Sequence, residues 1–506
     1  MLGDPTVQTT FLAITDLWEL VPEDHILKQA DAILDLSWLR DEVGDCYHPT
    51  LGRTAIAPEI ALRLMLAGYF LGEVKDRALM RRAQTDLAIR AFARLGIAPM
   101  VPDHSSLTRI RQRWGEARFL RVFVRSVRDC QAAGLVAGRL LHSDPTLVRA
   151  DVSWASMEEV EADAVTQATR MLKENMEPED EDNVPPPPKS KGKKRSRTDP
   201  DATLATAQKH RPMEPCYKVH HVVDSQSGVI VDVAVTTGEE SAGPRLPETV
   251  ARVTATLGAA PAQWTADTES ASGDNYAFCE MQGIEAVIPH PQVRRKPARR
   301  GKGTRRAKAQ AKRRKHPQRI PARRFKYDPQ HRLVRCPCHH WLYPYHRNEQ
   351  GWLYRGDPRV CGACSCRVRC FAPTGRARVI LIVDGYEAWL RARRERERGW
   401  TKEKRAAYRS HRQRIEGVQG EAKEQHGLRR AVRRGTDNMT IQAALTATVM
   451  NLKRLARAHA RSRGLCTAGF LYAVWLRIWA GVCCKTAQKI KAPAHAANMA
   501  STACAA

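Results

Sequence analysis

The sequence has few acidic and few aromatic residues for its length. Of 506 residues, 54 are Asp or Glu against 83 Lys or Arg, and 6% are aromatic. The formal net charge is therefore +29, and the sequence pI is about 9.9. A cationic surplus of this size indicates a polyanionic partner, nucleic acid before a membrane surface. With 43% hydrophobic residues the chain is not wholly disordered, and its length allows about three domains.

Export and membrane signals are also lacking. The first 25 residues hold acids and no basic residue ahead of their apolar ones, which argues against a secretory signal. The most apolar stretch, Cys466 to Cys484, carries Arg477 near its centre, where a charge is costly in a bilayer. We expect an appended apolar helix rather than a membrane anchor, no membrane partner, and a cytoplasmic, nucleoid-associated protein.

Fourteen cysteines in so long a chain do not form a secreted disulfide scaffold, and six of them lie close together in the sequence between Cys336 and Cys370.

Composition and periodicity divide the chain into five blocks. They are, in order, a helical N-terminal domain for DNA binding or dimerisation (1–137), the first part of a catalytic core (138–292, with a low-complexity insertion at 157–210), a basic and Cys-rich insertion (293–380), the second part of the core (381–460) and an apolar tail (461–506). In the first block, a helix after Asp103 or Ser105 carries Arg109, Arg111 and Arg113. Such a helix suits a DNA groove, and a solvated face in a small bundle is the alternative.

Strands and helices follow one another in a particular order after the first block. We expect a strand with Asp144 that ends in a turn at Asp144-Pro145, then a hairpin, a helix, a strand ending in Asp267, a helix and a strand. A long polar helix from about 395 to 428 follows the insertion. This order predicts an α/β fold, with an RNase H-like catalytic domain, an all-helical N-terminal domain and a Cys-rich basic insertion.

Three acids stand out by their placement. Asp144 and Asp267 lie at predicted strand ends, and Glu416 lies in the middle of the polar helix. Carboxylate oxygens are the ligands that Mg²⁺ prefers, and a pair of such ions promotes phosphoryl transfer. Taken singly, the acids have plainer interpretations as a turn former, a helix cap and a charge on a solvated face.

The helix around Glu416 weakens the plain interpretation of that acid. Arg412, Glu416 and Lys423 fall within about 40° of one helix face. A carboxylate between two cations fits a metal ligand flanked by phosphate contacts. An intrahelical salt bridge between Arg412 and Glu416 is the alternative. No P-loop or nucleophile-elbow motif competes with metal-dependent chemistry.

Several segments together resemble one family. The spacing Arg412-x3-Glu416-x6-Lys423 matches the last three elements of the Tyr-x2-Arg-x3-Glu-x6-Lys signature of a group of DDE-type insertion-sequence transposases. The segments DPTLVRADVS, with Asp144, and WTADTESASG, with Asp267, are similar to the two aspartate segments of that family. The N-terminal DHSSLTRIRQRW and the later MTIQAALTATVMNLKRLA are similar to its opening and closing segments. The resemblance covers about residues 20–455.

The resemblance implies an enzyme that binds element ends and catalyses metal-dependent DNA cleavage and strand transfer. It implies Mg²⁺ or Mn²⁺ on Asp144, Asp267 and Glu416, and phosphate contacts from Arg412 and Lys423. Double-stranded DNA, as element ends and target, is the implied partner, and the pairing of two ends implies a homodimer on DNA. An RNase H-like nuclease without strand transfer and an inactive, element-derived DNA-binding protein remain alternatives.

The signature tyrosine departs from this pattern. Arg409 stands at its expected position and Tyr408 comes one residue early, which turns the ring by about 100° on a helix. Tyr408 is our candidate for a contact with a flipped or unpaired base, and local packing is the alternative.

The insertion contains a basic run and a cysteine cluster. From Arg294 to Arg324 there are 16 Lys or Arg in 31 residues and no acid, which predicts salt-sensitive binding to DNA of any sequence. Downstream, the cysteine spacing is typical of a zinc knuckle or ribbon. Our choice of ligands for a structural Zn²⁺ is Cys336, Cys361, Cys364 and Cys370. Substitutes for one or more of them are Cys338, His339 and Cys366, and free buried thiols are the alternative.

Overall fold

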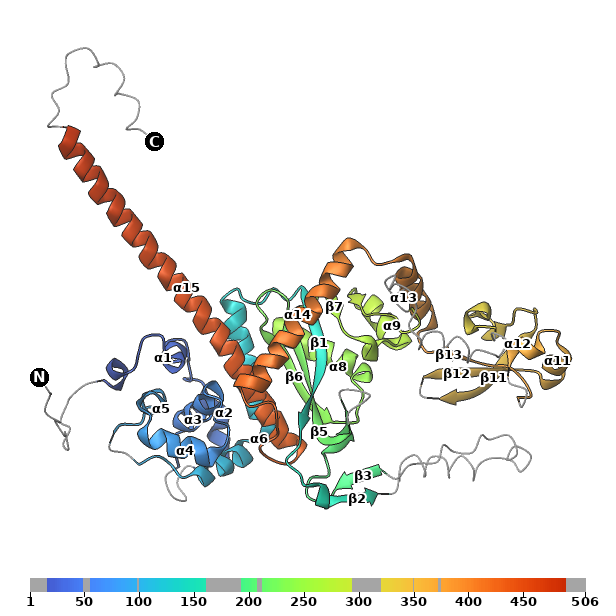
Figure 1. Cartoon of the computed structure of the whole chain (residues 1–506), viewed down its shortest axis with the longest axis horizontal. Coiled ribbons are helices and arrows are strands. Elements are labelled where there is room, and N and C mark those ends of the chain that lie inside the picture. The colour runs from blue at the N-terminus through green and yellow to red at the C-terminus, as the bar shows by residue number, and fades with distance from the viewer. Residues whose placement is uncertain are drawn as a thin grey trace, which may run out of the picture.

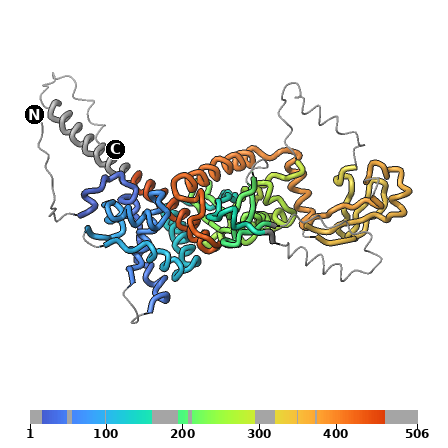
Figure 2. The backbone as a smooth tube through the Cα atoms, turned by 60° about the horizontal axis from the view of Figure 1, so that its bottom comes forward, coloured from blue at the N-terminus to red at the C-terminus, as the bar shows by residue number. Residues whose placement is uncertain are grey.

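The structure is a computed structural model that describes residues 16–48, 55–97, 100–160, 193–206, 212–293, 320–348, 350–371 and 375–487. Most of the low-complexity insertion and nearly all of the basic run lie outside these residues. The described residues combine helices with three sheets, which confirms the expected α/β class. Figures 1 and 2 both place the N-terminal helices at one end of the molecule and a second, smaller sheet at the other.

The N-terminal block is helical, as expected. Its elements are η1 (Leu17–Leu20), α1 (Ile26–Asp31), α2 (Leu39–Val43), η2 (Gly44–Cys46), α3 (Pro58–Phe70), α4 (Asp76–Thr85), α5 (Leu87–Phe92) and α6 (His104–Ala132). α3 is central, because every residue from Ala61 to Phe70 is buried. One apolar cluster runs from these helices through to the main sheet, so the block shares its core with the rest of the chain.

The basic helix of this block is α6, and its arginines do not form one surface. Asp103 caps the helix as expected, accepting a hydrogen bond from the Ser105 N–H. Arg111 is buried, however, and is ion-paired with Asp76 on α4. The expectation of a DNA-facing stripe that includes Arg111 is therefore wrong, because this guanidinium is used inside the fold. Asp76 also binds Arg433, so it links α4 and α6 to the segment before the last helix.

The main sheet has six strands. Its elements and the short strands beside it are β1 (Leu140–Arg149), η3 (Trp154–Ser156), β2 (Met157–Val160), β3 (Lys193–Ser196), β4 (Thr203–Ala205), β5 (Glu214–Asp224), β6 (Ile230–Thr237), η5 (Gly243–Arg245), α8 (Leu246–Leu257), β7 (Gln263–Thr265), η6 (Thr268–Ser270), α9 (Gly273–Met281) and β8 (Glu285–Val287). β5 pairs with β1 antiparallel and carries β4 and β6 on its other edge, whereas β7 and β8 continue from β1 in parallel. The order of β1, β5, β6, α8, β7, α9 and β8 is the expected one, although β7 ends at Thr265 rather than at Asp267. The short strands β2, β3 and β4 were not expected, because they lie within the stretch interpreted as a low-complexity insertion.

β1 is longer than the sequence indicates. We expected a turn at Asp144-Pro145, but β1 continues to Arg149. Pro145 lacks an N–H, yet it is tolerated because β7 pairs with β1 only as far as His142. On that side of β1, no ladder hydrogen bond is lost.

Two further helices complete the core, where one long helix was expected. They are α13 (Tyr386–Arg398) and α14 (Lys402–Gln425). Gly399, with φ of 98°, ends α13, and the Thr401 side chain caps α14 by accepting a hydrogen bond from Lys404 N–H at 3.2 Å. α14 lies across one face of the main sheet, in contact with β1, β5, β7 and β8 (Figure 1).

The second sheet forms between β8 and α13. Its elements are η7 (Ala322–Arg324), β9 (Lys326–Asp328), β10 (Leu333–Arg335), β11 (Trp341–Asn348), β12 (Gly351–Gly356), α11 (Pro358–Ala363), α12 (Arg367–Cys370) and β13 (Val379–Val383), with the strands in the order β13-β12-β11-β10-β9. Gly385 joins this sheet to α13 with φ of 64°, and its backbone passes so close to Gly273 at the start of α9 that neither position has room for a Cβ.

The last helix, α15 (Thr436–Ala487), connects both ends of the core. It contacts α1, α3 and α6 as well as β5 and β6. Asn451, fully buried on α15, donates a hydrogen bond to the carbonyl of Ile230 and accepts one from its N–H. No helix in the described part of the chain is both long and apolar enough to cross a membrane.

Candidate active site

Asp144 and Asp267 lie at the same level of neighbouring parallel strands. The register of β1 and β7 sets His142 opposite Thr265, and each aspartate is two residues further along its strand direction. Because side chains alternate between the two faces of a sheet, Asp144 belongs to the face that His142 and Thr265 share. Asp267 lies two residues beyond the end of β7, close enough to Asp144 to raise the pKa of that carboxyl. The face that carries Asp144 is the one covered by α14.

A buried hydrogen-bonded bridge fixes α14 over this face. The Thr265 hydroxyl oxygen lies 2.6 Å from His142 Nδ1 and 2.9 Å from His411 Nδ1 on α14. Burial lowers the pKa of His142 to about 3 and that of His411 to about 4, so both rings are neutral at physiological pH. Ile415 and Val418 continue the buried stripe of α14 beyond His411. The bridge therefore sets how far the helix stands from the two strands.

Asp144 is the most perturbed acid of the site. Burial raises its pKa to about 7, with further repulsion from Asp267, Glu269 and Glu416. Gln419 on α14 opposes this rise, because its amide donates a hydrogen bond to Asp144 Oδ2 at 3.2 Å. The same amide donates to the Asp144 carbonyl, also at 3.2 Å. The strand, the helix and three other carboxylates thus meet around one partly buried side chain.

Asp267 has a structural role as well as its place in the site. It caps η6, accepting a hydrogen bond from the Glu269 N–H at 2.8 Å. Burial raises its pKa, and the Glu269 N–H opposes the rise. The capping interpretation of this acid is therefore correct, and the cap leaves Asp267 close enough to repel Asp144.

Glu416 is more exposed than the two aspartates. Its side chain is 63% exposed and accepts a hydrogen bond from Arg412 Nε at 2.8 Å, which is the intrahelical salt bridge held open as an alternative. Lys423, two turns further on, is partly buried; burial lowers its pKa, Arg429 lowers it further, and Asp144 raises it. Lys423 is therefore near enough to Asp144 for the two charges to interact, while Arg412 and Glu416 pair with each other.

Tyr408 packs locally. Its ring stacks on the imidazole of His411 at 5.8 Å between centroids and meets the Trp400 ring edge-on at 5.4 Å. The local-packing interpretation of Tyr408 therefore describes the structure.

Three residues of this region were not predicted from the sequence. Gln419 and Glu269 lie three and two residues from the acids that the sequence singles out, but nothing in their residue type marks them. His221 lies directly opposite Asp144 on β5, fully buried, and neither ring nitrogen has a hydrogen-bond partner among the described residues. Burial lowers the pKa of His221 to about 3. A strand pairing was needed to bring this ring next to Asp144.

The two aspartates fit a divalent cation by their chemistry. They are hard oxygen donors, partly buried, and each carries a raised pKa that a nearby positive charge would reverse. In the described part of the chain, Asp144, Asp267 and Glu416 do not all lie within 4.8 Å of one another. Glu416 is paired with Arg412 on the same helix.

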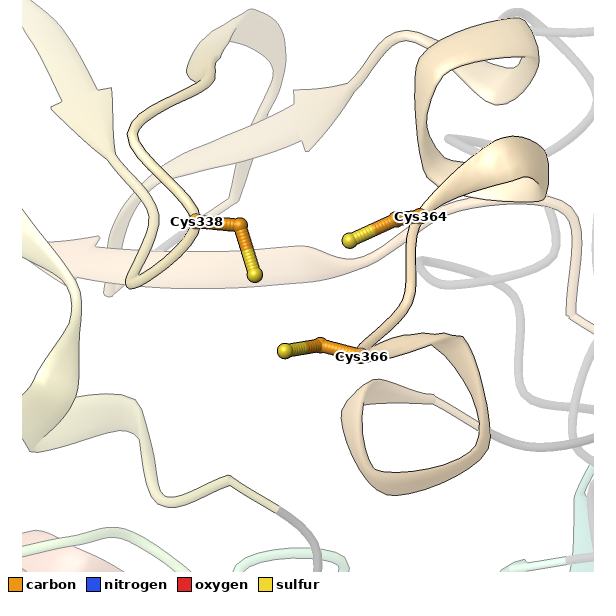
Figure 3. Close-up of side chains that lie close together, drawn as sticks. All are labelled: Cys338, Cys364 and Cys366. Atoms are coloured by element: carbon orange, nitrogen blue, oxygen red, sulfur yellow. The ribbon is translucent and has the colours of Figure 1, made fainter.

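One group in the described residues does meet that limit, and it consists of thiols. Cys338 follows β10, and Cys364 and Cys366 follow α11, with their sulfur atoms within 4.8 Å of one another (Figure 3). In tetrahedral zinc sites the sulfurs are about 3.8 Å apart, given a Zn–S distance of about 2.3 Å. A hydrogen bond between Cys338 and Cys366 lowers the pKa of the Cys366 thiol and raises that of the Cys338 thiol. This trio therefore fits three of the four positions of a zinc site.

The trio differs from the set chosen on spacing. Only Cys364 belongs to both, and Cys338 and Cys366 are two of the substitutes. All six cysteines of the insertion nevertheless line one cavity of about 260 Å³, together with His339 and His340. Cys336 accepts a hydrogen bond from the His340 N–H at 3.3 Å. The fourth ligand therefore has several candidates within the same cavity.

Two family models match parts of the chain. Residues 15–113 match the family model described as Transposase domain (DUF772), and residues 335–456 match the one described as Transposase DDE domain. The second match includes Glu416 and the six cysteines of the insertion. No curated protein and no solved structure is significantly similar to the chain.

Proposed function

From the premise that this chain is a DDE-type insertion-sequence transposase, as its two transposase domains indicate, we propose that it binds the ends of its element, cuts them and joins them to target DNA. The observation that carries the proposal is the placement of Asp144 and Asp267. They come from segments 123 residues apart, yet Asp267 lies close enough to Asp144 to raise the pKa of that carboxyl.

The sheet supports an RNase H-like catalytic domain. Its central order β6-β5-β1-β7-β8, with only β5 antiparallel to its neighbours, places the first strand in the middle of the sheet. Asp144 then lies on the central strand, and Asp267 lies at the end of the adjoining parallel strand. The ends of parallel strands are where α/β proteins bind ligands.

Asp144, Asp267 and Glu416 would hold Mg²⁺ or Mn²⁺, which supplies an activated water and neutralises charge on the scissile phosphate. Gln419 orients the Asp144 carboxylate by its hydrogen bond. Glu416 must leave Arg412 to reach the two aspartates, and DNA phosphate is a suitable new partner for that guanidinium. Lys423, already beside Asp144, is placed to contact a phosphate next to the scissile bond.

The remaining partners follow from the reaction and the charge. Double-stranded DNA binds along the basic surfaces, two element ends require a homodimer, and the protein works on nucleoid DNA in the cytoplasm. A contact of Tyr408 with an unpaired base stays a prediction, since its ring packs on Trp400 and His411 in the structure. A structural Zn²⁺ held by Cys338, Cys364, Cys366 and a fourth ligand from the same cavity would stabilise the second sheet.

Nicking of an element end tests the proposal. The chain offers a matched pair of acids on α14, since Glu416 and Glu424 are both exposed and each is ion-paired with an arginine. We expect Asp144→Asn, Asp267→Asn and Glu416→Gln each to lower Mg²⁺-dependent nicking by at least about a hundredfold, while Glu424→Gln retains it. Retained nicking in all three variants would reject the assignment of these acids.

Strand transfer separates the two alternatives. A nuclease of this fold would nick the end and produce no joined product with a target plasmid. An inactive DNA-binding derivative would shift the end in a gel without nicking it. Inverted repeats around the coding region, with a short target duplication outside them, favour the transposase over both.

A further inference from the structure

The outer face of the second sheet exposes aromatic rings in a row. Trp341 and Tyr343 alternate with buried Leu342 on β11, so both rings lie on the same side, and they are 37% and 54% exposed. Tyr345, at a bulge further along β11, is 53% exposed. The opposite side of the sheet is covered by its own small core, which includes Val334. The exposed rings are therefore not needed to fill that core.

Cations flank these rings on the neighbouring strands. The register sets Arg335 on β10 opposite Trp341, and Arg355 on β12 opposite Tyr343. The Arg335 guanidinium lies over the Trp341 ring at 5.8 Å, and that of Arg355 lies over Tyr345 at 4.9 Å. These contacts hold the rings in place before any partner binds.

The same face carries little negative charge. Lys326 on β9 lies opposite Arg335 and extends the row of cations. Among the five strands of this sheet, the only acid is Asp328, which is paired with His331 at 2.8 Å. In the sequence, the run with 16 Lys or Arg leads directly into β9. This face therefore suits an anionic ligand with flat apolar surfaces.

We propose that the outer face of the β9–β12 sheet binds unpaired DNA bases, by stacking them on Trp341, Tyr343 and Tyr345 between arginines that contact the phosphates. Nucleic-acid bases have the required flat faces, and an interleaving of aromatic rings with cations suits a single strand without regard to its sequence. In a duplex the bases are stacked inside and cannot reach these rings. The proposal rests on the proposed function, because cutting and joining a DNA end is what would present unpaired bases to this sheet.

Binding to single-stranded and duplex DNA tests this inference. Fluorescence anisotropy of the full-length protein would use a labelled oligothymidine and a duplex of equal length, at physiological salt. We expect Tyr343→Ala to weaken oligothymidine binding about fivefold or more and to leave duplex binding within about twofold of the unchanged chain. Tyr343→Phe keeps the ring and should retain the affinity, and Trp341→Ala gives a second, independent result.

A ring outside the sheet provides the matched control. Trp154 is 52% exposed on η3, and Trp154→Ala should bind oligothymidine like the unchanged chain. Thermal unfolding of each variant checks that its fold is intact. Unaltered oligothymidine binding by both Tyr343→Ala and Trp341→Ala would overturn the inference, and so would an equal loss for duplex and single strand. Nicking by the unchanged chain is measured separately, so a failure of the proposed function is distinguishable from a failure here.

Discussion

Replacing Asp144 by Asn should stabilise the metal-free protein at high pH. In the fold, burial and the neighbouring acids raise the pKa of this carboxyl from 3.8 to about 7, so its ionised form is penalised there. A rise of this size corresponds to a destabilisation of the fold by about 4 kcal/mol once the carboxyl is ionised. Because the side chain is partly in contact with water, we expect a destabilisation of about 2 kcal/mol. The amide keeps the shape of the side chain and can still accept the hydrogen bond from Gln419.

The sign of the effect follows from the raised pKa. Below pH 3.8, the pKa in the unfolded chain, the carboxyl is neutral in both the folded and the unfolded state and does not affect stability. The destabilisation grows as the pH rises towards 7, the pKa in the fold, and is complete above it. The free energy of unfolding of Asp144→Asn should therefore exceed that of the unchanged chain by about 2 kcal/mol near pH 8.5, and by much less near pH 5.

Urea titrations in a chelator at the two pH values measure this difference. Added Mg²⁺ should stabilise the unchanged chain and leave Asp144→Asn almost unaffected, because the cation relieves the same repulsion that the amide removes. Glu424→Gln serves as the control for loss of one acid elsewhere on the catalytic helix. A difference between Asp144→Asn and the unchanged chain that is equal at both pH values would refute the reasoning.

Three further outcomes are expected. Gln419→Ala removes the amide donor that lowers the pKa of Asp144. The pH profile of Mg²⁺-dependent nicking should therefore move about one pH unit higher. An unmoved profile would show that this hydrogen bond is unimportant. The Cys366→Ser variant should lose most of its zinc, as measured by mass spectrometry of the purified protein, whereas the Cys46→Ser control should keep it. Equal zinc contents in the two variants would argue against a site formed by Cys338, Cys364 and Cys366. Asp76→Ala leaves the buried Arg111 and the half-buried Arg433 without their shared carboxylate. We expect it to lower the free energy of unfolding, measured in urea, by about 3–5 kcal/mol, and a loss under about 1 kcal/mol would contradict this role.

Local structure was largely predictable from the sequence, because it depends on near neighbours. The Asp103 cap and the strand and helix order from β1 to β8, apart from the short β2, β3 and β4, follow from short-range periodicity and capping chemistry. The break between α13 and α14 was missed although its signals, Gly399 and Thr401, are local. A glycine in a strongly polar run is easily passed over, since no change in periodicity marks it.

The details of the site depend on distant pairings and were less accessible. Sequence position singled out Asp144 and Asp267, but only the strand register shows that they share a level and that His221 lies beside one of them. The use of Arg111 in a buried ion pair and the choice of Cys338 and Cys366 among six thiols are likewise set by segments far apart in the chain. Spacing rules do not contain that information.

The contacts of α15 have a consequence for synthesis of the protein. This helix covers parts of α1, α3 and α6, although about 370 residues separate α3 from the start of α15. At about 5–20 residues per second, the ribosome needs about 20–70 s to make the intervening chain. During that time the surfaces of α1, α3 and α6 that pack against α15 in the finished protein lack this cover, which leaves apolar side chains of the nascent helices open to other contacts.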